Sequence, residues 1–425
     1  MARFIIEGGR PLNGSVRPSG NKNEALPTIM ATLLTEEPIT LKRMPKIGDV
    51  VTSCELLRKM GAEVEWLDDE TVTICTKNVK SAKPPVEECT KIRASILLMG
   101  PLLSRFGEME LPLPGGDVIG ARRIDTHWEG IETLGGELKL DHSIKGKMNK
   151  IIGTDVYLDE PSVTGTENLI LLAVRCQGKT VLHNAACEPH VVGLCEMMVA
   201  MGAKINGIGS NRLEITGVEK LGGCEHEIGP DFMEVGSFLC LGAIAKGKVT
   251  IEDCRLKDMR FALKTLSRLG INPITEDNRL MIDGTRNIQM KRDVTGRVGT
   301  IYSGPWPAYP TDLMSVAIVA ATQSQGTVIF FEKMFEGRMF FTDKLMEMGA
   351  NIVMCDPHRI VVTGPSQLYA SHMSSPDVRA GMSLLMAALI ALGKSEIDNI
   401  YQIERGYFNI GHKLEALGAA IKRVS

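Results

Sequence analysis

Several cations of this sequence stand where a positive charge is costly or has no obvious structural reason. Lys22, Arg93 and Arg379 fall in the first turns of predicted helices, where the helix dipole disfavours a positive charge. Three more arginines follow predicted strands at equivalent positions, namely Arg122, Arg338 and Arg405. Each could form an ordinary ion pair, but cations beside free helix amides are typical of anion-binding sites. The pattern predicts a cationic cleft between two domains, suited to a substrate with several phosphates or carboxylates.

Three aspartates stand near the starts of predicted helices, namely Asp231, Asp312 and Asp377. Their simplest role is an N-cap, in which the side chain accepts hydrogen bonds from free helix amides. A carboxylate inside a cationic site can instead be a counter-ion, or a general base that removes a proton from a substrate hydroxyl. The residue types alone leave these roles open.

A further carboxylate, Asp117, belongs to the stretch "LPLPGGDVIGARRID", residues 111–125. The prolines and glycines predict a loop, and Arg122 and Arg123 follow shortly after. A solvated surface loop and a chemical role for Asp117 are both compatible with this stretch by itself.

The composition of the 425 residues is that of a soluble globular protein, with 44% hydrophobic and 23% charged residues. This length favours two or three domains. A net charge of -3 indicates neither nucleic acid nor membrane as a partner. No apolar run is long enough to cross a bilayer, and "MARFIIEGG" does not resemble a signal peptide. The ten cysteines and eight histidines lack metal-ligand spacing, so we expect no metal, reduced thiols and a cytoplasmic protein.

A repeat along the chain indicates which elements position these residues. Among the Leu-Gly and Met-Gly pairs of the sequence, six lie about 70 residues apart, with the glycines Gly61, Gly135, Gly202, Gly270, Gly349 and Gly418. Each follows an amphipathic segment and precedes a strand pattern, so it is predicted to end a helix in the left-handed conformation. "GKT" at Gly178 and "GKS" at Gly393 lack the first glycine of a phosphate-binding loop and are predicted to be helix-to-strand turns.

The last copy of the repeat lacks a strand, and "FIIEG" near the N-terminus supplies a matching one. The N-terminal strand is therefore predicted to pair with the C-terminal part. Six units then divide into two domains of three, one of residues 22–232 and one of residues 1–21 and 233–425. Each mixes helices and strands, so the predicted class is α/β or α+β.

The motifs resemble the enolpyruvyl transferase family over essentially the whole chain. They are, in order, "SGNKNEALP", "IRASILLMGPL", "LPGGDVIGAR", "PSVTGTENL", "YPTDLM", "FEGRM", "DVRAG" and "IERGY". The resemblance implies two similar domains of three βαβαββ units each, the inside-out α/β barrel. It also implies transfer of an enolpyruvyl group from phosphoenolpyruvate to the 3-hydroxyl of UDP-N-acetylglucosamine, without metal or organic cofactor. That reaction belongs to peptidoglycan synthesis, and so to cell wall biogenesis, cell shape and cell division.

The resemblance also implies residue roles. Lys22, Arg122 and Arg405 bind the phosphate of phosphoenolpyruvate, and Arg338 and Arg405 bind its carboxylate. Asp312 takes the proton of the sugar hydroxyl, Asp377 orients Lys22 or Arg405, and Asp117 is the general acid. The implied substrate-binding residues are Asn23, Arg93, Arg122, Arg123, Asp125, Ser162, Val163, Thr164, Asp231, Met334, Arg338, Asp377 and Arg379.

The chain departs from the family pattern at several positions. Asp117 replaces the cysteine that most members carry, which predicts insensitivity to fosfomycin, because a carboxylate is a far weaker nucleophile than a thiolate. Arg123 replaces the usual proline, and Thr164 with Gly165 replaces Gly-Ala. These changes concern recognition of the sugar nucleotide more than the enolpyruvyl chemistry.

Three alternatives follow from the same patterns. One is an enolpyruvyl transferase with another acceptor, such as a variant nucleotide sugar or shikimate 3-phosphate, although the long "PGGDVIGARRID" loop disfavours the shikimate branch. The second is a silent paralogue that binds UDP-sugars. The third is an RNA 3'-phosphate cyclase, which shares the repeat but needs a nucleophilic histidine in a motif that this chain lacks.

Overall fold

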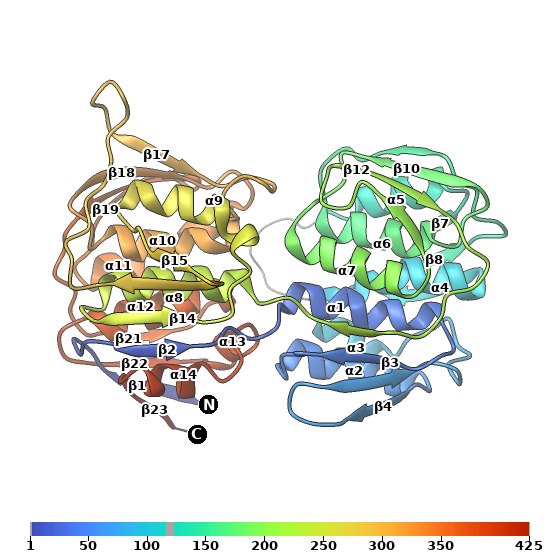
Figure 1. The fold of residues 1–425 in the computed structure, drawn as a ribbon, viewed down its shortest axis with the longest axis horizontal. Coiled ribbons are helices and arrows are strands. Elements are labelled where there is room, and N and C mark those ends of the chain that lie inside the picture. The colour runs from blue at the N-terminus through green and yellow to red at the C-terminus, as the bar shows by residue number, and fades with distance from the viewer. Residues whose placement is uncertain (1, 116–122, 425) are drawn as a thin grey trace. The chain divides into compact units, whose positions relative to one another are not determined.

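The structure is a computed structural model that describes residues 2–115 and 123–424 (Figure 1). The chain divides into two compact units. The first unit comprises residues 20–115 and 123–229, and the second unit comprises residues 2–19 and 230–424. Each unit combines mixed sheets with helices, so the fold belongs to the α/β class.

The described residues of the second unit form three four-stranded sheets. Their strand orders are β21-β22-β1-β23, β15-β16-β14-β2 and β17-β18-β20-β19. The strands are β1 (Arg3–Glu7), β2 (Gly14–Val16), β14 (Lys248–Ile251), β15 (Ile274–Glu276), β16 (Arg279–Asp283), β17 (Gly299–Tyr302), β18 (Gly326–Phe331), β19 (Asn351–Asp356), β20 (Arg359–Gly364), β21 (His372–Ser374), β22 (Lys394–Asp398) and β23 (Ala420–Val424). Each sheet joins one parallel pair to antiparallel strands, as in β21 beside β22. Phe4 of β1 is opposite Ile397 of β22 and Arg423 of β23, so the N-terminal strand lies within a C-terminal sheet.

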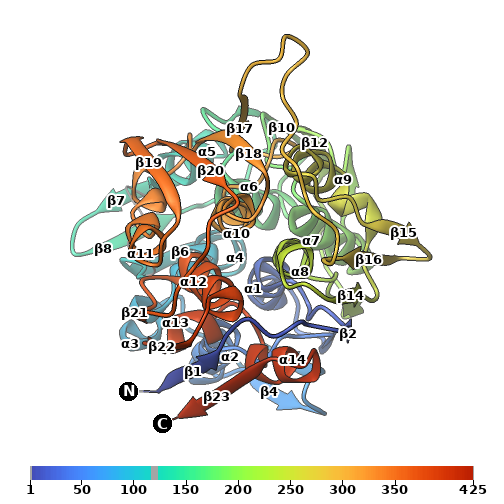
Figure 2. The ribbon, with the colours of Figure 1, turned by 90° about the vertical axis from the view of Figure 1, so that its left-hand side faces the viewer.

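Three apolar helices occupy the interior of the second unit, with the sheets around them (Figure 2). They are α8 (Phe232–Ile244), α10 (Met314–Ala321) and α12 (Val378–Ile390). Every residue of α8 and α10 is buried, because these helices are apolar on all sides rather than on one stripe. The remaining helices are α9 (Leu256–Leu266), η3 (Ser267–Leu269), η4 (Thr311–Leu313), η5 (Glu336–Met339), α11 (Thr342–Glu347), α13 (Tyr401–Glu404) and α14 (Ile410–Ala416).

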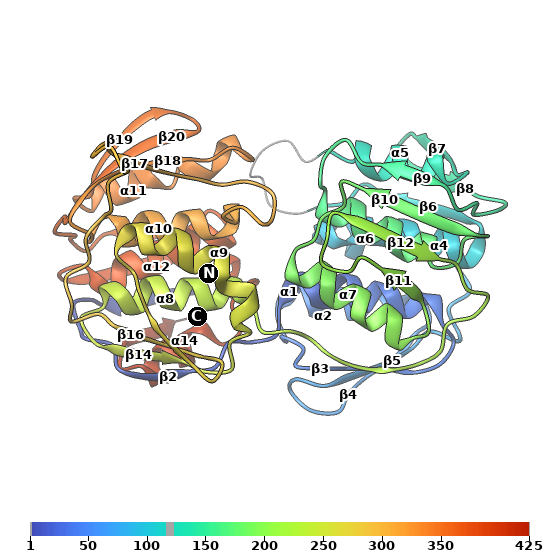
Figure 3. The same ribbon diagram turned by 45° about the horizontal axis from the view of Figure 1, so that its top comes forward.

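The described residues of the first unit form sheets of order β13-β3-β5-β4, β11-β12-β10-β9 and β6-β8-β7 (Figure 3). The strands are β3 (Ile39–Lys42), β4 (Glu63–Trp66), β5 (Val72–Cys75), β6 (Glu108–Pro112), β7 (Glu137–Leu140), β8 (Ser143–Lys147), β9 (Asp155–Tyr157), β10 (Lys179–His183), β11 (Lys204–Asn206), β12 (Arg212–Thr216) and β13 (Glu225–Glu227). The helices are α1 (Lys22–Ala31), η1 (Thr32–Leu34), α2 (Gly48–Lys59), α3 (Val86–Lys91), η2 (Arg93–Leu98), α4 (Met99–Phe106), α5 (Asp125–Thr133), α6 (Val163–Ala173) and α7 (Pro189–Ala200).

The six repeated glycines have the conformation that the sequence predicts. Their φ angles lie between 84° and 106°, which is the left-handed region, with the members Gly61, Gly135, Gly202, Gly270, Gly349 and Gly418. A residue with a Cβ is strained there, which accounts for glycine after each of these helices. The turns at Gly178 and Gly393 directly precede β10 and β22, so the prediction of helix-to-strand turns is also confirmed.

The chain passes between the units after Ser19 and after Gly229. Near these two crossing points, a backbone hydrogen bond in each unit joins the two chain segments. Asp231 N donates to Ser19 O at 2.8 Å in the second unit, and Asn21 N donates to Gly229 O at 2.8 Å in the first. The two helices that begin here, α8 and α1, therefore start from fixed backbone positions.

The ten cysteines lie within the described residues and are free thiols, for example the buried Cys54 and Cys240 and the exposed Cys355. No helix in the described part of the chain has the length and apolar character needed to span a membrane.

Candidate functional site

Lys22 is the first residue of α1, and its ammonium group is paired with a carboxylate of α2. Lys22 Nζ lies 3.2 Å from Asp49 Oδ2, and the two side chains are 14% and 10% exposed. Asn21 caps α1, since its Oδ1 accepts hydrogen bonds from Asn23 N at 2.8 Å and Glu24 N at 3.3 Å. This cap fixes the turn that carries Lys22 and Asn23. Asp49 was not among the residues identified from sequence, where "KIGDV" offers no motif.

Two more predicted cations of the first unit are described. Arg93 is half-buried at the first residue of η2. Arg123 Nε lies 2.9 Å from Asp125 Oδ2, and both side chains are largely exposed. Their hydrogen bond raises the pKa of Arg123 and lowers that of Asp125. The predicted general acid Asp117 and the predicted phosphate ligand Arg122 lie outside the described residues.

The first turn of α6 carries the predicted nucleotide-binding residues Ser162, Val163 and Thr164. Ser162 is the N-cap, and its Oγ accepts a hydrogen bond from Gly165 N at 3.2 Å. Thr164 Oγ1 lies 3.1 Å from Nε2 of His127, a buried residue of α5. The first amides of a helix have no intrahelical acceptor, so this turn presents donors to an anion. His127, in "RIDTHW", was not identified from sequence.

Asp312 of η4 connects two of the predicted arginines in the second unit. Arg338 Nη2 lies 2.5 Å from Asp312 Oδ1, and Arg379 Nε lies 3.0 Å from Asp312 Oδ2. The arginine side chains are only 8% and 6% exposed. Arg338 Nε and Arg379 Nη1 are buried and have no hydrogen-bond partner among the described residues. Since a buried guanidinium is stable only when its charge and donors are satisfied, these two groups are suited to bind a further anion.

A buried glutamate, Glu332, fixes the loop that leads to Arg338. Its Oε1 accepts hydrogen bonds from Ser303 Oγ at 2.7 Å and Met334 N at 2.8 Å. Its Oε2 accepts from Thr311 Oγ1, next to Asp312 in the chain, at 2.8 Å. Glu332 therefore ties the segments of Asp312 and Arg338 to one strand end, while Met334 is 39% exposed. The sequence "FFEKMF" gave no sign of this role.

The predicted carboxylates Asp231 and Asp377 are helix caps. Asp231 Oδ1 accepts from Met233 N at 2.8 Å at the start of α8, and Asp377 Oδ1 accepts from Arg379 N at 2.8 Å at the start of α12. Burial raises the pKa of Asp231, and the charge of Arg379 opposes this rise. The structure thus supports the capping role that the sequence left open, and the orienting role of Asp377 stays a prediction.

Arg405 and Arg379 are both buried beside polar groups of the second unit. Arg405 Nη1 donates to Gln402 Oε1 at 3.1 Å. The Arg379 guanidinium lies 5.4 Å from the ring centroid of Tyr407, whose hydroxyl is 3.0 Å from Ser237 Oγ. Burial alone would lower the pKa of Arg379, but Asp312, Tyr407 and Asp231 raise it, so the guanidinium is charged at every working pH.

The predicted site residues are thus distributed over both units. The first unit carries Lys22, Asn23, Arg93, Arg123, Asp125, Ser162, Val163 and Thr164, and the second carries Asp231, Asp312, Met334, Arg338, Asp377, Arg379 and Arg405. Within the second unit the structure brings Asp312, Arg338 and Arg379 into direct contact. Within the described ranges, no group of three or more histidine, cysteine, aspartate or glutamate side chains could hold a metal ion.

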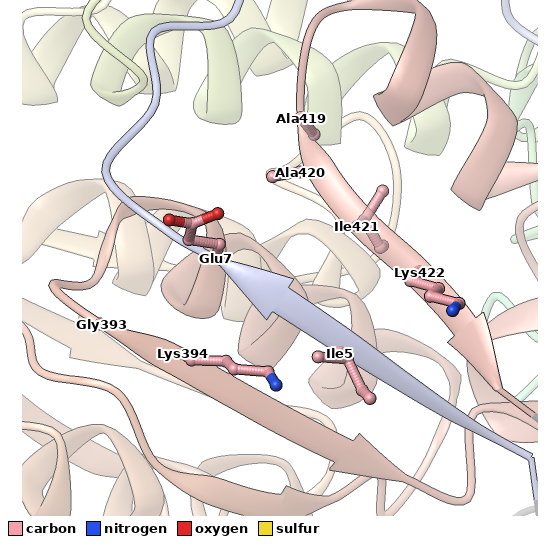
Figure 4. Close-up of a pocket in the computed structure, with 8 residues that line it drawn as sticks. All are labelled: Ile5, Glu7, Gly393, Lys394, Ala419, Ala420, Ile421 and Lys422. Atoms are coloured by element: carbon pink, nitrogen blue, oxygen red, sulfur yellow. The ribbon is translucent and has the colours of Figure 1, made fainter.

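A shallow pocket of about 620 Å³ lies elsewhere in the second unit (Figure 4). It is lined by residues at β1, β22 and β23, including Glu7, Lys394 and Lys422. None of the predicted site residues lines it, and its acid and lysines are of the kind that commonly occur on a solvated sheet face. This pocket is therefore not part of the site that the sequence predicts.

The sequence comparisons identify the family of the chain. Residues 6–414 match the family model described as EPSP synthase (3-phosphoshikimate 1-carboxyvinyltransferase). The chain belongs to this family of enolpyruvyl transferases. It is 51% identical over 425 residues to a UDP-N-acetylglucosamine 1-carboxyvinyltransferase of Borreliella burgdorferi, covering 100% of this chain and 99% of the relative. It is 50% identical to the Bradyrhizobium diazoefficiens protein of that name, over 99% of this chain and 98% of the relative.

Solved structures support the fold. The enolpyruvyl transferase NikO from Streptomyces tendae matches with a TM-score of 0.88 and 22% identity, over 100% of this chain and 99% of the other. EPSP synthase from Acinetobacter baumannii matches with a TM-score of 0.77 and 17% identity over 100% of both chains. At these identities the likeness establishes the α/β architecture and carries no information about the acceptor.

Proposed function

We propose that this chain transfers the enolpyruvyl group of phosphoenolpyruvate to the 3-hydroxyl of UDP-N-acetylglucosamine, releasing phosphate. The observation that carries the proposal is the Asp312 cluster, in which one carboxylate lies between two buried arginines that retain unpaired donors. Phosphoenolpyruvate carries both a phosphate and a carboxylate, so it needs several such cations. The curated relatives at 51% and 50% identity carry the corresponding name, whereas the alternative acceptors have no comparable support.

The proposed reaction is an addition followed by an elimination. The sugar oxygen bonds to C2 of phosphoenolpyruvate while its proton passes to Asp312, and the C3 methylene receives a proton from Asp117. In the elimination, the Asp117 carboxylate takes a proton back from C3 and the C2–O bond to phosphate breaks, which restores the enol ether. The proton held by Asp312 passes to the departing phosphate, so both aspartates return to their starting state. General base and general acid steps of this kind each contribute about 10²–10⁴-fold.

The remaining roles follow the chemistry of each side chain. Lys22, Arg122 and Arg405 bind the phosphate of phosphoenolpyruvate, and Arg338 with Arg405 binds its carboxylate. The residues proposed for the sugar nucleotide are Asn23, Arg93, Arg123, Asp125, Ser162, Val163, Thr164, Asp231, Met334 and Arg379. The exposed Arg123–Asp125 pair and the first turn of α6 support this assignment, since each presents polar groups at the surface.

The proposal also includes the detailed architecture of the two units and the cellular process that the reaction serves. Six βαβαββ repeats would form two inside-out α/β barrels. This arrangement is supported by the five four-stranded sheets of the described residues, each of which has one parallel and two antiparallel pairings. The reaction would supply peptidoglycan synthesis in the cytoplasm, and so contribute to cell shape and division. Asp117 in place of cysteine supports insensitivity to fosfomycin.

One assay tests the function. The protein is incubated with phosphoenolpyruvate and UDP-N-acetylglucosamine, and phosphate release and product mass are measured. Parallel reactions contain shikimate 3-phosphate, another UDP-sugar or no acceptor. We expect release with UDP-N-acetylglucosamine, loss of activity in Arg338→Ala, and normal activity in Arg359→Ala, whose arginine forms an exposed ion pair. Release with another acceptor alone, or with none of them, would contradict the proposal.

A further inference from the structure

Three side chains form a hydrogen-bonded network between α6 and α5: Asn168 of α6, His127 of α5 and Thr164 of α6. Asn168 and Thr164 are four residues apart on α6, so they share a face of that helix. Both are hydrogen-bonded to the same ring of α5: Asn168 Nδ2 lies 2.8 Å from His127 Nδ1, and Thr164 Oγ1 lies 3.1 Å from His127 Nε2. Asn168 and His127 are buried, and Thr164 is half-buried.

The surroundings of Asn168 determine the direction of these hydrogen bonds. Asn168 Oδ1 accepts from Gly100 N at 2.8 Å, and Asn168 Nδ2 donates to Ile96 O at 2.8 Å. A backbone amide only donates and a carbonyl only accepts, so the orientation of the side-chain amide is unambiguous. The second hydrogen of Nδ2 therefore points to His127 Nδ1, which must accept and cannot carry a proton.

The tautomer of His127 follows from this acceptor role. Burial, together with the charge of Arg93, lowers the pKa of His127 to about 3, so its ring is neutral. A neutral ring without a proton on Nδ1 carries it on Nε2. Nε2–H then donates to Thr164 Oγ1. The hydroxyl of Thr164 has accepted one hydrogen bond, and its own proton has no acceptor among the described residues.

The remaining donor of Thr164 lies in the first turn of an eleven-residue helix. The amide ends and the helix dipole favour a negatively charged oxygen there. We propose that His127 is a positioning residue that fixes the Thr164 hydroxyl as a hydrogen-bond donor to a phosphate oxygen of the sugar nucleotide. This inference rests on the proposed function, and it adds His127 to the residues that determine the affinity for the sugar nucleotide. Family members with glycine in place of Thr164 lack this donor.

Thr164→Val tests the inference, because valine has the same shape without the hydroxyl. We expect it to raise the KM for UDP-N-acetylglucosamine about tenfold, the size of a lost hydrogen bond to a charged group. The KM for phosphoenolpyruvate and kcat should change less than about twofold. Thr164→Ser keeps the hydroxyl and should resemble the wild type. Thr133→Val is the matched control, since that hydroxyl donates to Glu129 O on the exposed side of α5.

A double-mutant cycle separates positioning from simple packing. His127→Phe should raise the same KM several-fold in the wild-type background and have no further effect in Thr164→Val, because both changes remove one donor. His127→Gln, which retains an N–H near the position of Nε2, should recover most of the affinity. Unchanged KM in Thr164→Val, equal loss in Thr164→Ser, or additive effects would overturn the inference.

Calorimetric titration with UDP distinguishes failure of this inference from failure of the proposed function. If the wild type binds UDP but releases no phosphate from phosphoenolpyruvate, the proposed reaction fails, and the UDP affinities of Thr164→Val and Thr164→Ser still test the hydrogen bond. We expect weaker UDP binding in the valine variant alone. Equal affinities in the three proteins would contradict the role of Thr164, whatever the reaction. Circular dichroism of each variant verifies that it is folded.

Discussion

Lys22 Nζ lies 3.2 Å from Asp49 Oδ2, and this pair is largely shielded from solvent. The cation at the start of α1 is therefore held by a partner from the following helix. A shielded ion pair strongly fixes its members, since removal of one charge leaves the other insufficiently compensated. Asp49 thus restrains the position of the ammonium group of Lys22, the group that we propose binds a phosphate.

We predict that Asp49→Asn lowers kcat/KM for phosphoenolpyruvate about tenfold, equivalent to about 1.4 kcal/mol of transition-state stabilisation. Asparagine keeps the shape but removes the charge, so Lys22 would adopt more than one position. Steady-state kinetics measure the effect. The control is Asp69→Asn, because Asp69 forms an ion pair with Lys46 in which its side chain is 86% exposed. An unchanged kcat/KM in Asp49→Asn would show that Lys22 does not depend on this partner.

We predict that Asp312→Asn lowers kcat by about 10²–10⁴-fold, since the amide cannot accept the proton of the sugar hydroxyl. If Asp312 is only a counter-ion, the substitution should instead change the KM for phosphoenolpyruvate more than kcat, because Arg338 and Arg379 lose their charged partner. Single-turnover rates separate these cases. Asp343→Asn on the exposed side of α11 is the matched control. More than about a tenth of the wild-type rate in Asp312→Asn would exclude the general-base role.

The sequence predicts features that depend on local conformation and misses those that depend on packing. The glycine at 349 needs a left-handed conformation, and Lys22 follows a capping residue, so both are visible in a short stretch. Asp49 reaches Lys22 from another helix, and Glu332 accepts hydrogen bonds from Ser303 and Thr311, which lie 29 and 21 residues earlier in the chain. Such pairings arise from how elements pack, and a carboxylate in "KIGDV" or "FFEKMF" looks like any surface acid.

Stability should depend on pH through His127, whose pKa in the folded protein is about 3, compared with 6.5 when exposed. Between these values the unfolded chain binds a proton that the native ring does not, so the free energy of unfolding falls as pH falls. We predict that His127→Gln reduces this dependence by about 1 kcal/mol per pH unit between pH 6 and 5. Urea denaturation at each pH measures it. His142→Gln, at a fully exposed histidine, should leave the dependence unchanged.

Glu167 should affect the pH dependence of stability in the opposite direction to His127, so that the free energy of unfolding falls as pH rises. Burial, and then the charge of Glu188, raises the pKa of Glu167 well above its ordinary value of 4.5. The native acid keeps its proton where the unfolded chain releases it, so the stabilisation is complete below pH 4.5 and is lost as pH rises. We predict that Glu167→Gln weakens the fall in unfolding free energy between pH 5 and 7 by about 1 kcal/mol per unit. The exposed Glu196→Gln is the control; equal slopes in all three proteins would refute the neutral state of Glu167.

The last prediction concerns Asp117, which lies outside the described residues and is argued from its chemistry. As general acid it must carry a proton when the methylene carbon of phosphoenolpyruvate accepts one. Neighbouring arginines favour the ionised form, whereas the negative charges of bound substrates and the exclusion of water favour the neutral acid. We therefore expect Asp117 to be protonated only with substrates bound. Asp117→Asn cannot donate this proton and should lose most activity.

The residue at position 117 is also expected to determine whether the enzyme reacts with fosfomycin. The resemblance to cysteine-bearing relatives implies that a thiolate at this loop opens the epoxide, and a carboxylate attacks far more slowly. We predict that the wild type retains its activity after incubation with fosfomycin, while Asp117→Cys remains active and becomes sensitive. Mass spectrometry of the treated proteins measures adduct formation, with Cys355, an exposed thiol away from this loop in sequence, reporting non-specific alkylation. A stoichiometric adduct on Asp117 would refute the predicted insensitivity to fosfomycin. Full activity of Asp117→Asn would refute the assignment of this aspartate as the acid, because another group would then have to supply the proton.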